Sequence, residues 1–245
     1  MNIGMYQSAA SLTALERWQD AVAQNITASQ VNGFKKRTVE FSAMPMGEIS
    51  TGAERGTEEL SGMMPKASYG ISFTAGETTP TGRNLDVALQ GEGFFKIQTA
   101  SGQPIYTRTG QFQLSPERTL VTSDGSPVLS ENGAPITALA QAGDLAIATD
   151  GTVSQGDTQL GKIGVFRFAN NSVLTPIGGG AFDAGTATPT TVEKPNVLQG
   201  YLESSNVTPL REMVALVQIA RAYEANQKII TSRDQTMQRA LETLG

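Results

Sequence analysis

Residues 208–244 read TPLREMVALVQIARAYEANQKIITSRDQTMQRALETL, and this stretch decides the fold. Thr208 supplies a hydroxyl for a helix N-cap, and Pro209 follows at the first helical position, where its missing N–H costs nothing. No Gly or further Pro interrupts the stretch before Leu244. The sequence therefore predicts one helix that is roughly 55 Å long at 1.5 Å per residue.

Apolar or small residues recur along this helix at a spacing of three and four. They predict a heptad seam that is interrupted at Gln227 and Asp234. The seam consists of Met213, Leu216, Ala220, Tyr223, Ile230, Met237, Leu241 and Leu244. Because the helix has only one apolar stripe, it needs a partner that covers the stripe.

The N-terminal segment carries a weaker version of the same pattern. Met5, Leu12, Leu15, Val22 and Ile26 share one register, with Ser8 and Gln19 as gaps. We expect this helix to stop near Asn32-Gly33, where Gly can adopt the left-handed conformation of a C-cap. It too has a single stripe that requires a partner.

Residues 85–203 have the alternation and turn signals of β structure. Phe95 and Ile97 alternate with polar residues. The pairs Asp124-Gly125, Asn132-Gly133 and Asp150-Gly151 predict hairpin turns with positive φ at both central residues. A further strand is expected at 161–168. We predict one small all-β domain here.

Residues 44–84 have no lasting period and are punctuated by Gly, Pro, Ser and Thr. We expect an extended arm or linker with one short strand near Ser68–Thr74, and a disordered linker stays open as the alternative.

The predicted fold class is therefore α+β, with terminal helices that form a coiled-coil assembly domain. The expected boundaries are 1–43 for the N-terminal helix, 44–84 for the arm, 85–203 for the central β domain and 204–245 for the C-terminal helix. A β domain of this size has a radius of gyration of roughly 13 Å. Since the long helix cannot lie wholly against it, we expect the N-terminal helix of the same chain and terminal helices of other chains to cover the seam.

Composition excludes several classes of function. The 245 residues include no Cys and no His, so disulfides, Cys/His metal sites and Ser-His or Cys-His catalysis are excluded. The net charge of −5 disfavours a nucleic-acid surface. No apolar run is long enough to span a membrane. Met1–Ser11 lacks the basic start and apolar core of a secretory signal, so we expect no cleaved signal.

Three stretches of the sequence have partial features of a catalytic or ligand site, and none has a complete pattern. Residues 156–162 match the first seven positions of a P-loop, but Ile163 stands where the Mg²⁺-binding hydroxyl should be, and a strand pattern follows. Gly91-Glu92-Gly93 is interpreted as a turn. The acidic residues Glu54, Glu58 and Glu59 lie in the irregular arm. We expect no catalytic residue, no metal and no cofactor.

Three blocks of the sequence resemble the rod and hook family of bacterial flagellar axial proteins. The first is residues 23–28 (AQNITA) followed by Asn32-Gly33-Phe34-Lys35. The second covers residues 85–95 (LDVALQGEGFF) and 106–112 (YTRTGQF), and the third covers 200–207 (GYLESSNV) and 221–228 (RAYEANQK). Three blocks in the right order identify the family more strongly than any one block.

The residues that match the family motifs are Gly33, Phe34, Asp86, Gly91, Gly93, Phe94, Tyr106, Arg108, Gly110, Glu203, Asn206, Arg221, Glu224 and Asn226. The resemblance also adds Asn25 to the N-terminal half of the assembly interface, beside Leu12, Leu15, Val22 and Ile26.

Two departures from the family pattern carry expectations. Gln24 and Ala28 stand where the family usually has Asn, so that part of the helix is expected to bond its neighbours differently. Ser115-Pro116-Glu117-Arg118 replaces the usual Asp-x-x-Gly turn. Because Arg tolerates positive φ poorly, we expect a different hairpin there.

The resemblance implies a structural subunit, not an enzyme, that polymerises through paired terminal helices into the hollow rod around the export channel. It implies copies of itself and other rod subunits as partners, together with the flagellar type III export apparatus and surrounding ring proteins. No nucleic acid and no membrane insertion are expected, and the location is the basal body where it spans the periplasm. Length favours a rod protein over a hook protein, and the compact middle favours the proximal rod over the distal rod.

Alternatives stay open at this point. A distal rod subunit or a short hook-type subunit would fit the same motifs. A secreted β-domain binding module or a rod-associated peptidoglycan hydrolase would be proteins of a different class. The binding module leaves the terminal seams unexplained, and the hydrolase lacks a focused pair of carboxylates.

Overall fold

A computed structural model describes residues 3–45, 48–50, 57–59, 63–140 and 143–244. The chain divides into two compact units. A helical unit contains Met1–Thr27, Arg37–Ile71 and Thr208–Gly245, and a β unit contains Ala28–Lys36 and Ser72–Val207. The chain therefore passes between the two units four times. In the described residues, no helix has both the length and the apolar character needed to cross a membrane.

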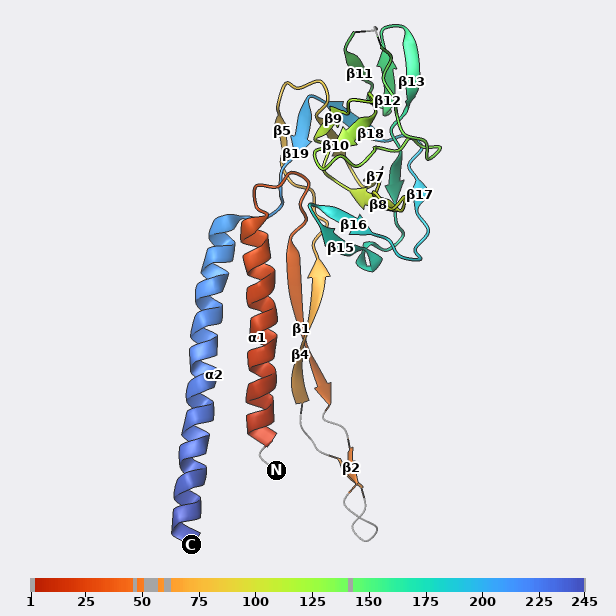
Figure 1. Ribbon diagram of the computed structural model, residues 1–245. Coiled ribbons are helices and arrows are strands. Elements are labelled where there is room, and N and C mark those ends of the chain that lie inside the picture. Colours follow the sequence, from red (N-terminus) through yellow and green to blue (C-terminus); the bar gives the residue numbers. More distant parts are fainter. Residues whose placement is uncertain (1–2, 46–47, 51–56, 60–62, 141–142, 245) are drawn as a thin grey trace. The chain divides into compact units, whose positions relative to one another are not determined.

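The helical unit is built on α1 (Ile3–Thr27) and α2 (Pro209–Leu244), which contact each other and run antiparallel (Figure 1). α2 begins at Pro209, as the Thr-Pro pair predicts. α1 ends at Thr27, before the expected Asn32-Gly33 stop, and turns occupy the residues between. Gly33 does adopt the left-handed conformation, at φ +71°, but in the β unit and away from the helix end.

A long hairpin covers a second side of α1. β1 (Arg37–Pro45) and β4 (Met63–Ile71) pair antiparallel along their whole lengths, and the short strands β2 (Glu48–Ser50) and β3 (Thr57–Glu59) pair beyond them. The arm expected at 44–84 thus contributes one strand of a hairpin, whose partner starts at Arg37. Val39 and Phe41 alternate with polar neighbours, and Phe41 packs edge-on against Trp18 at 5.8 Å.

The β unit is made of short strands. Its central sheet has the strand order β15-β16-β8-β7-β14-β17. Neighbouring strands in this sheet pair antiparallel. The strands of this sheet are β7 (Phe94–Gln98), β8 (Pro104–Thr107), β14 (Val165–Arg167), β15 (Thr175–Gly178), β16 (Ala181–Asp183) and β17 (Thr190–Thr191), with a 3₁₀ turn at Asn171–Val173. The strand expected at 161–168 is interrupted at Ile163-Gly164, which lie between two strands.

Smaller sheets complete the unit. They are formed by β5 (Thr78–Pro80), β6 (Val87–Gln90), β9 (Phe112–Leu114), β10 (Leu120–Thr122), β11 (Leu145–Ile147), β12 (Thr152–Gln155), β13 (Thr158–Lys162), β18 (Asn196–Gln199) and β19 (Tyr201–Glu203). β18 pairs with β6, and β19 pairs with β5. The last strands of the unit therefore pair with its first strands. The P-loop-like residues 156–162 form the turn and second strand of the β12–β13 hairpin.

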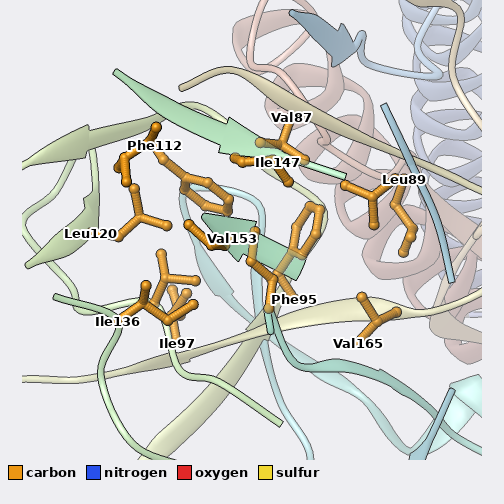
Figure 2. Packing of buried hydrophobic residues seen from close by; sticks show 14 of the residues in the cluster. Val87, Leu89, Phe95, Ile97, Phe112, Leu120, Ile136, Ile147, Val153 and Val165 are labelled. Atoms are coloured by element: carbon orange, nitrogen blue, oxygen red, sulfur yellow. The ribbon is translucent and has the colours of Figure 1, made fainter. Parts of the chain in front are cut away.

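The aliphatic core of the β unit lies where these sheets meet (Figure 2). Val87, Phe95, Phe112, Leu120 and Val153 have no exposed surface, and the rings of Phe95 and Phe112 pack edge to face at 5.4 Å. A second cluster is aromatic and contains Phe73, Phe94, Phe168, Phe182 and Tyr106. The Phe94-Phe95 pair thus points one ring into each cluster.

The predicted Gly turns are present, but their geometry differs from the prediction. At Gly125, Gly133 and Gly151 the φ angles are +82°, +82° and +86°, and no residue before these glycines has positive φ. Each turn closes across three loop residues, as where Thr122 N–H donates to Ser126 O at 2.9 Å. A three-residue loop needs only its last residue in the left-handed conformation.

The hairpin at Ser115–Thr119 has the same form, which corrects the expectation of a different one. Ser115 N–H donates to Thr119 O at 2.9 Å, and Arg118 N–H donates to Ser115 O at 2.8 Å. Arg118 adopts φ +64°, where the other turns have Gly, and it is the one non-Gly residue with positive φ in the described chain. The backbone hydrogen bonds of the turn hold Arg118 in this conformation at a cost of about 1–2 kcal/mol.

We predict that Arg118→Gly stabilises the protein by about 0.5–1 kcal/mol, because relief of the left-handed strain exceeds the added chain entropy of Gly. Urea unfolding followed by circular dichroism measures the change. Gly133→Ala is the matched control, since Gly133 occupies the same turn position with open space around it. It should destabilise by about 1 kcal/mol, and an Arg118→Gly variant that is less stable than wild type would contradict this account.

Candidate functional site: helix faces and a buried ion cluster

The predicted N-terminal seam lies on the covered side of α1. Val22 and Asn25 are buried, and Leu12, Leu15 and Ile26 are half-buried. The side chain of Met5 lies outside the described part of the chain. α1 is covered both by α2 and by the β1–β4 hairpin, so these residues are shared between two contacts.

The predicted C-terminal seam is covered only in part within one chain. Leu216, Tyr223 and Ile230 are half-buried, whereas Met213, Ala220 and Met237 are exposed. The residues most deeply covered on α2 are Ile219 and Glu212, with 1% and 2% of their surface exposed. The side chains of Leu241 and Leu244 fall outside the described residues.

Helix geometry explains why the covered face differs from the predicted seam. The covered positions each lie one residue before a predicted seam position, as Ile219 lies before Ala220, and one residue turns a helix by about 100°. Met213 and Ala220 therefore turn outward, whereas Leu216 and Tyr223 stay half-buried. The face that α1 covers follows Glu212, Ile219 and Asn226, which the seam pattern missed because two of them are polar.

Asn25 joins three elements of the helical unit. Its amide nitrogen donates to Arg37 O at 2.8 Å and to Glu212 Oε2 at 3.1 Å, and its amide oxygen accepts from Arg37 N–H at 2.8 Å. These bonds link the end of α1 to the start of β1 and to the first turn of α2. Since Asn25 is fully buried, a side chain without the amide would leave these polar groups unsatisfied.

A buried ion cluster occupies the β unit, next to the places where the chain leaves it. Lys35 Nζ lies 2.5 Å from Glu203 Oε1 and donates to Thr74 O at 2.8 Å. Gly76 N–H donates to Glu203 Oε1 at 2.9 Å, and Arg108 Nε lies 3.4 Å from Glu203 Oε2. One carboxylate thus meets two cations in a site where each of the three side chains is nearly inaccessible.

Electrostatics in this cluster are dominated by burial. Removal from water lowers the pKa of Lys35, and the hydrogen bond and charge of Glu203 oppose that shift. Burial likewise lowers the pKa of Arg108, opposed by the charges of Glu203 and Glu92. Glu203 therefore stabilises the charged forms of both cations, which burial disfavours.

Arg108 connects the cluster to the β sheets. Its guanidinium donates to Gly91 O at 2.5 Å and to Leu89 O at 3.4 Å, and it lies 5.9 Å from the centre of the Phe94 ring. Gly33 packs directly on the backbone of the Arg108-Thr109 peptide. A Cβ atom at Gly33 would lie 2.5 Å from Arg108 C, so only Gly fits there.

Asn206 forms hydrogen bonds to the backbone of the same segments. Its side-chain oxygen accepts from Lys36 N–H at 2.6 Å, and its nitrogen donates to Ser72 O at 2.9 Å and to Thr74 O at 3.0 Å. Gly33 N–H also donates to Glu203 O at 2.7 Å. The segments that enter and leave the β unit are thus bound to one another inside it.

The other family-motif residues occupy separate places. Asp86 and Gly110 flank the contact in which Val87 N–H donates to Gly110 O at 2.9 Å, and a Cβ atom at Gly110 would lie 1.6 Å from Val87 O. Tyr106 packs in the aromatic cluster, where burial raises its pKa. Gly93 adopts φ +133° before β7.

Three motif residues lie on α2. Arg221 and Glu224 are exposed, and Asn226 is half-buried and donates to Ala222 O at 3.0 Å. Sequence reasoning placed Lys35 in a motif but did not foresee its pairing with Glu203. Two features of the sequence could have indicated this pair: Lys35 directly follows Gly33-Phe34, and Glu203 ends a strand-like stretch before the terminal helix.

Two stretches match families of known proteins. Residues 88–155 match the family described as flagellar hook protein FlgE/F/G D1 domain, and residues 198–243 match the one described as flagellar basal body rod FlgEFG protein C-terminal. The flagellar basal-body rod protein FlgF of Caulobacter vibrioides is 34% identical over 100% of this chain and 99% of its own. That of Rhizobium meliloti is 31% identical over the same shares. The rod protein FlgG of Bacillus subtilis is 33% identical over 96% of each chain.

We predict that Glu203→Gln destabilises the protein by about 3 kcal/mol, because it leaves Lys35 and Arg108 buried without their counter-charge. Chemical unfolding at neutral pH measures the loss. Glu117→Gln, an exposed acid in the same unit, is the matched control and should change stability by less than about 0.5 kcal/mol. Equal stability of Glu203→Gln and wild type would mean that the ion cluster does not hold the unit together.

Proposed function

The chain belongs to the rod and hook family of flagellar axial proteins, and from that premise we propose that it is a structural subunit of the bacterial flagellar basal-body rod. It polymerises through its terminal helices into the hollow shaft around the export channel. The match to rod proteins over the whole length of both chains carries this proposal.

The length of α2 supports assembly through the helices. α2 has 36 residues and α1 has 25, so α1 is too short to cover the last turns of α2. Residues 231–240 are exposed throughout, and they include Met237 of the predicted seam. An amphipathic helix end without cover gains stability when a neighbouring subunit covers it.

We extend the proposal to a coiled coil between α1 and α2 in the assembled rod. The contact between the two helices and the spacing of Glu212, Ile219 and Asn226 support it, because seven residues separate these positions along one face.

Domain boundaries at 43, 84 and 203 stay predictions. The β unit is proposed to lie outside the shaft, as the family resemblance implies.

Its place along the rod is proposed from length. The chain aligns end to end with relatives named FlgF and over 96% with relatives named FlgG, which supports an FlgF-type subunit. The proximal segment remains the predicted location. The type III export apparatus and the ring proteins of the periplasm remain predicted partners.

We predict that Met237→Asp lowers incorporation into the rod at least tenfold, because the charge falls on a face that neighbours must cover. Met237 is 46% exposed in the single chain, so the purified variant should keep wild-type stability. Immunoblots of isolated basal bodies measure incorporation. Gln238→Asp, the adjacent exposed residue, is the control and should be incorporated normally, whereas equal incorporation of both variants would argue against the seam.

A further inference from the structure

The first two turns of α2 carry an exposed apolar stripe. Leu210, Met213, Val214 and Val217 expose 72%, 52%, 52% and 53% of their surface. Their spacing of three, four and seven places them on one face, and that face points away from the one around Ile219 that α1 covers. The partner helix within the chain therefore cannot cover this stripe.

The same unit contains a groove, and most of the residues that line it are apolar. The groove has a volume of about 480 Å³ and lies between α1 and the hairpin. Its α1 side is formed by Ala10, Thr13, Ala14 and Arg17, and its hairpin side by Met44, Pro65, Lys66 and Ala67. Ala10, Thr13 and Ala14 on the α1 side are small and let another helix approach closely. At the end of this row, Arg17 Nη1 donates to Ala67 O at 2.7 Å and joins the two sides of the groove. Figure 1 shows α1 between α2 and the β1–β4 hairpin, and the residues that line the groove come from α1 and the hairpin alone.

Lengths and charges of the two surfaces match. From Ala10 to Arg17 and from Leu210 to Val217 the helix advances by the same seven residues, about 10.5 Å. When the two helices run antiparallel, with Leu210 opposite Arg17, exposed Glu16 falls opposite exposed Arg211. Asp20 then lies near the N-terminal end of α2, where the helix dipole favours a negative charge.

Resting on the proposed function, we propose that the Leu210–Val217 stripe of one copy docks antiparallel in the α1–hairpin groove of a second copy. α1 and α2 are antiparallel within each chain, so copies that all point the same way along a shaft present α2 to a neighbouring α1 in the required direction. Stripe and groove are different surfaces, so the contact is heterologous and repeats from one copy to the next. A rotation between copies that does not close a ring then gives an open helical polymer.

The small contact also explains how free subunits stay apart. A specific, stable interface buries roughly 1,600 Å² in total, whereas this one involves two helical turns. Two free copies therefore do not form a lasting dimer through it. At the end of a growing rod, the contact between stripe and groove acts together with the contact that buries the last turns of α2. Several contacts at once then hold the added subunit.

The first test compares Val217→Asp with Gln218→Asp. Both residues are exposed in the single chain, so both purified variants should melt at the wild-type temperature. Incorporation of Val217→Asp into basal bodies should fall at least tenfold, while Gln218→Asp stays within twofold of wild type. Normal incorporation of Val217→Asp, or equal loss in both variants, overturns the proposal.

The second test identifies the groove. Because the chain has no Cys, two introduced cysteines are the only thiols it carries. Thr13→Cys with Val214→Cys should give cross-linked dimers after oxidation of isolated basal bodies, and Thr13→Cys with Gln218→Cys should not. No dimer from the first pair, or equal yields from the two, overturns the docking. A cross-linked product of another mass means that a different axial subunit fills the groove, which also overturns it.

The outcome is distinguishable from failure of the proposed function. Wild-type protein that is absent from isolated basal bodies contradicts the rod assignment itself. Protein that is present but does not cross-link through Thr13→Cys and Val214→Cys contradicts only the contact between stripe and groove.

Discussion

The structure depends on holding together segments that are far apart in the sequence. Lys35 and Glu203 are separated by 168 residues, and their buried ion pair joins the segment after α1 to the segment before α2. Arg108 ties this pair to the sheets, and Asn206 adds the backbone of the segment after β4. In the helical unit, Asn25 performs the same task for α1, β1 and α2. The side chains of Lys35, Glu203, Arg108 and Asn25 are polar and buried, so the loss of one partner is costly.

The first and last strands of the β unit pair with each other, and this pairing affects how the unit folds. The last strands β18 and β19 pair with the first strands β6 and β5, and Glu203 is the final residue of β19. Contacts of such high sequence separation form at a high cost in loop entropy. The β unit therefore completes its fold only once almost all of the chain before α2 is available.

Much of the fold could be predicted from residue patterns. The Thr-Pro start located α2 to the residue, and Gly-containing turns marked the hairpins of the β unit, although their loops have three residues instead of two. Arg118 could not be predicted, because the hydrogen bonds that hold it at positive φ come from the rest of the hairpin. The β1–β4 hairpin was missed since its pairing depends on the surface of α1, with Trp18 packed on Phe41. The covered face of α2 was displaced from the heptad because polar Glu212 and Asn226 take part in it.

The central claim is that faces of α2 left open in the single chain are covered in the rod. Electron cryo-microscopy of isolated basal bodies, at a resolution that shows side chains, tests it most directly. The account predicts this subunit in the axial rod, with the outward face of residues 210–217 and the Met237 face of the last turns of α2 buried against neighbouring subunits. Density that places the protein outside the rod, or that leaves both of these α2 surfaces open to solvent, would contradict it.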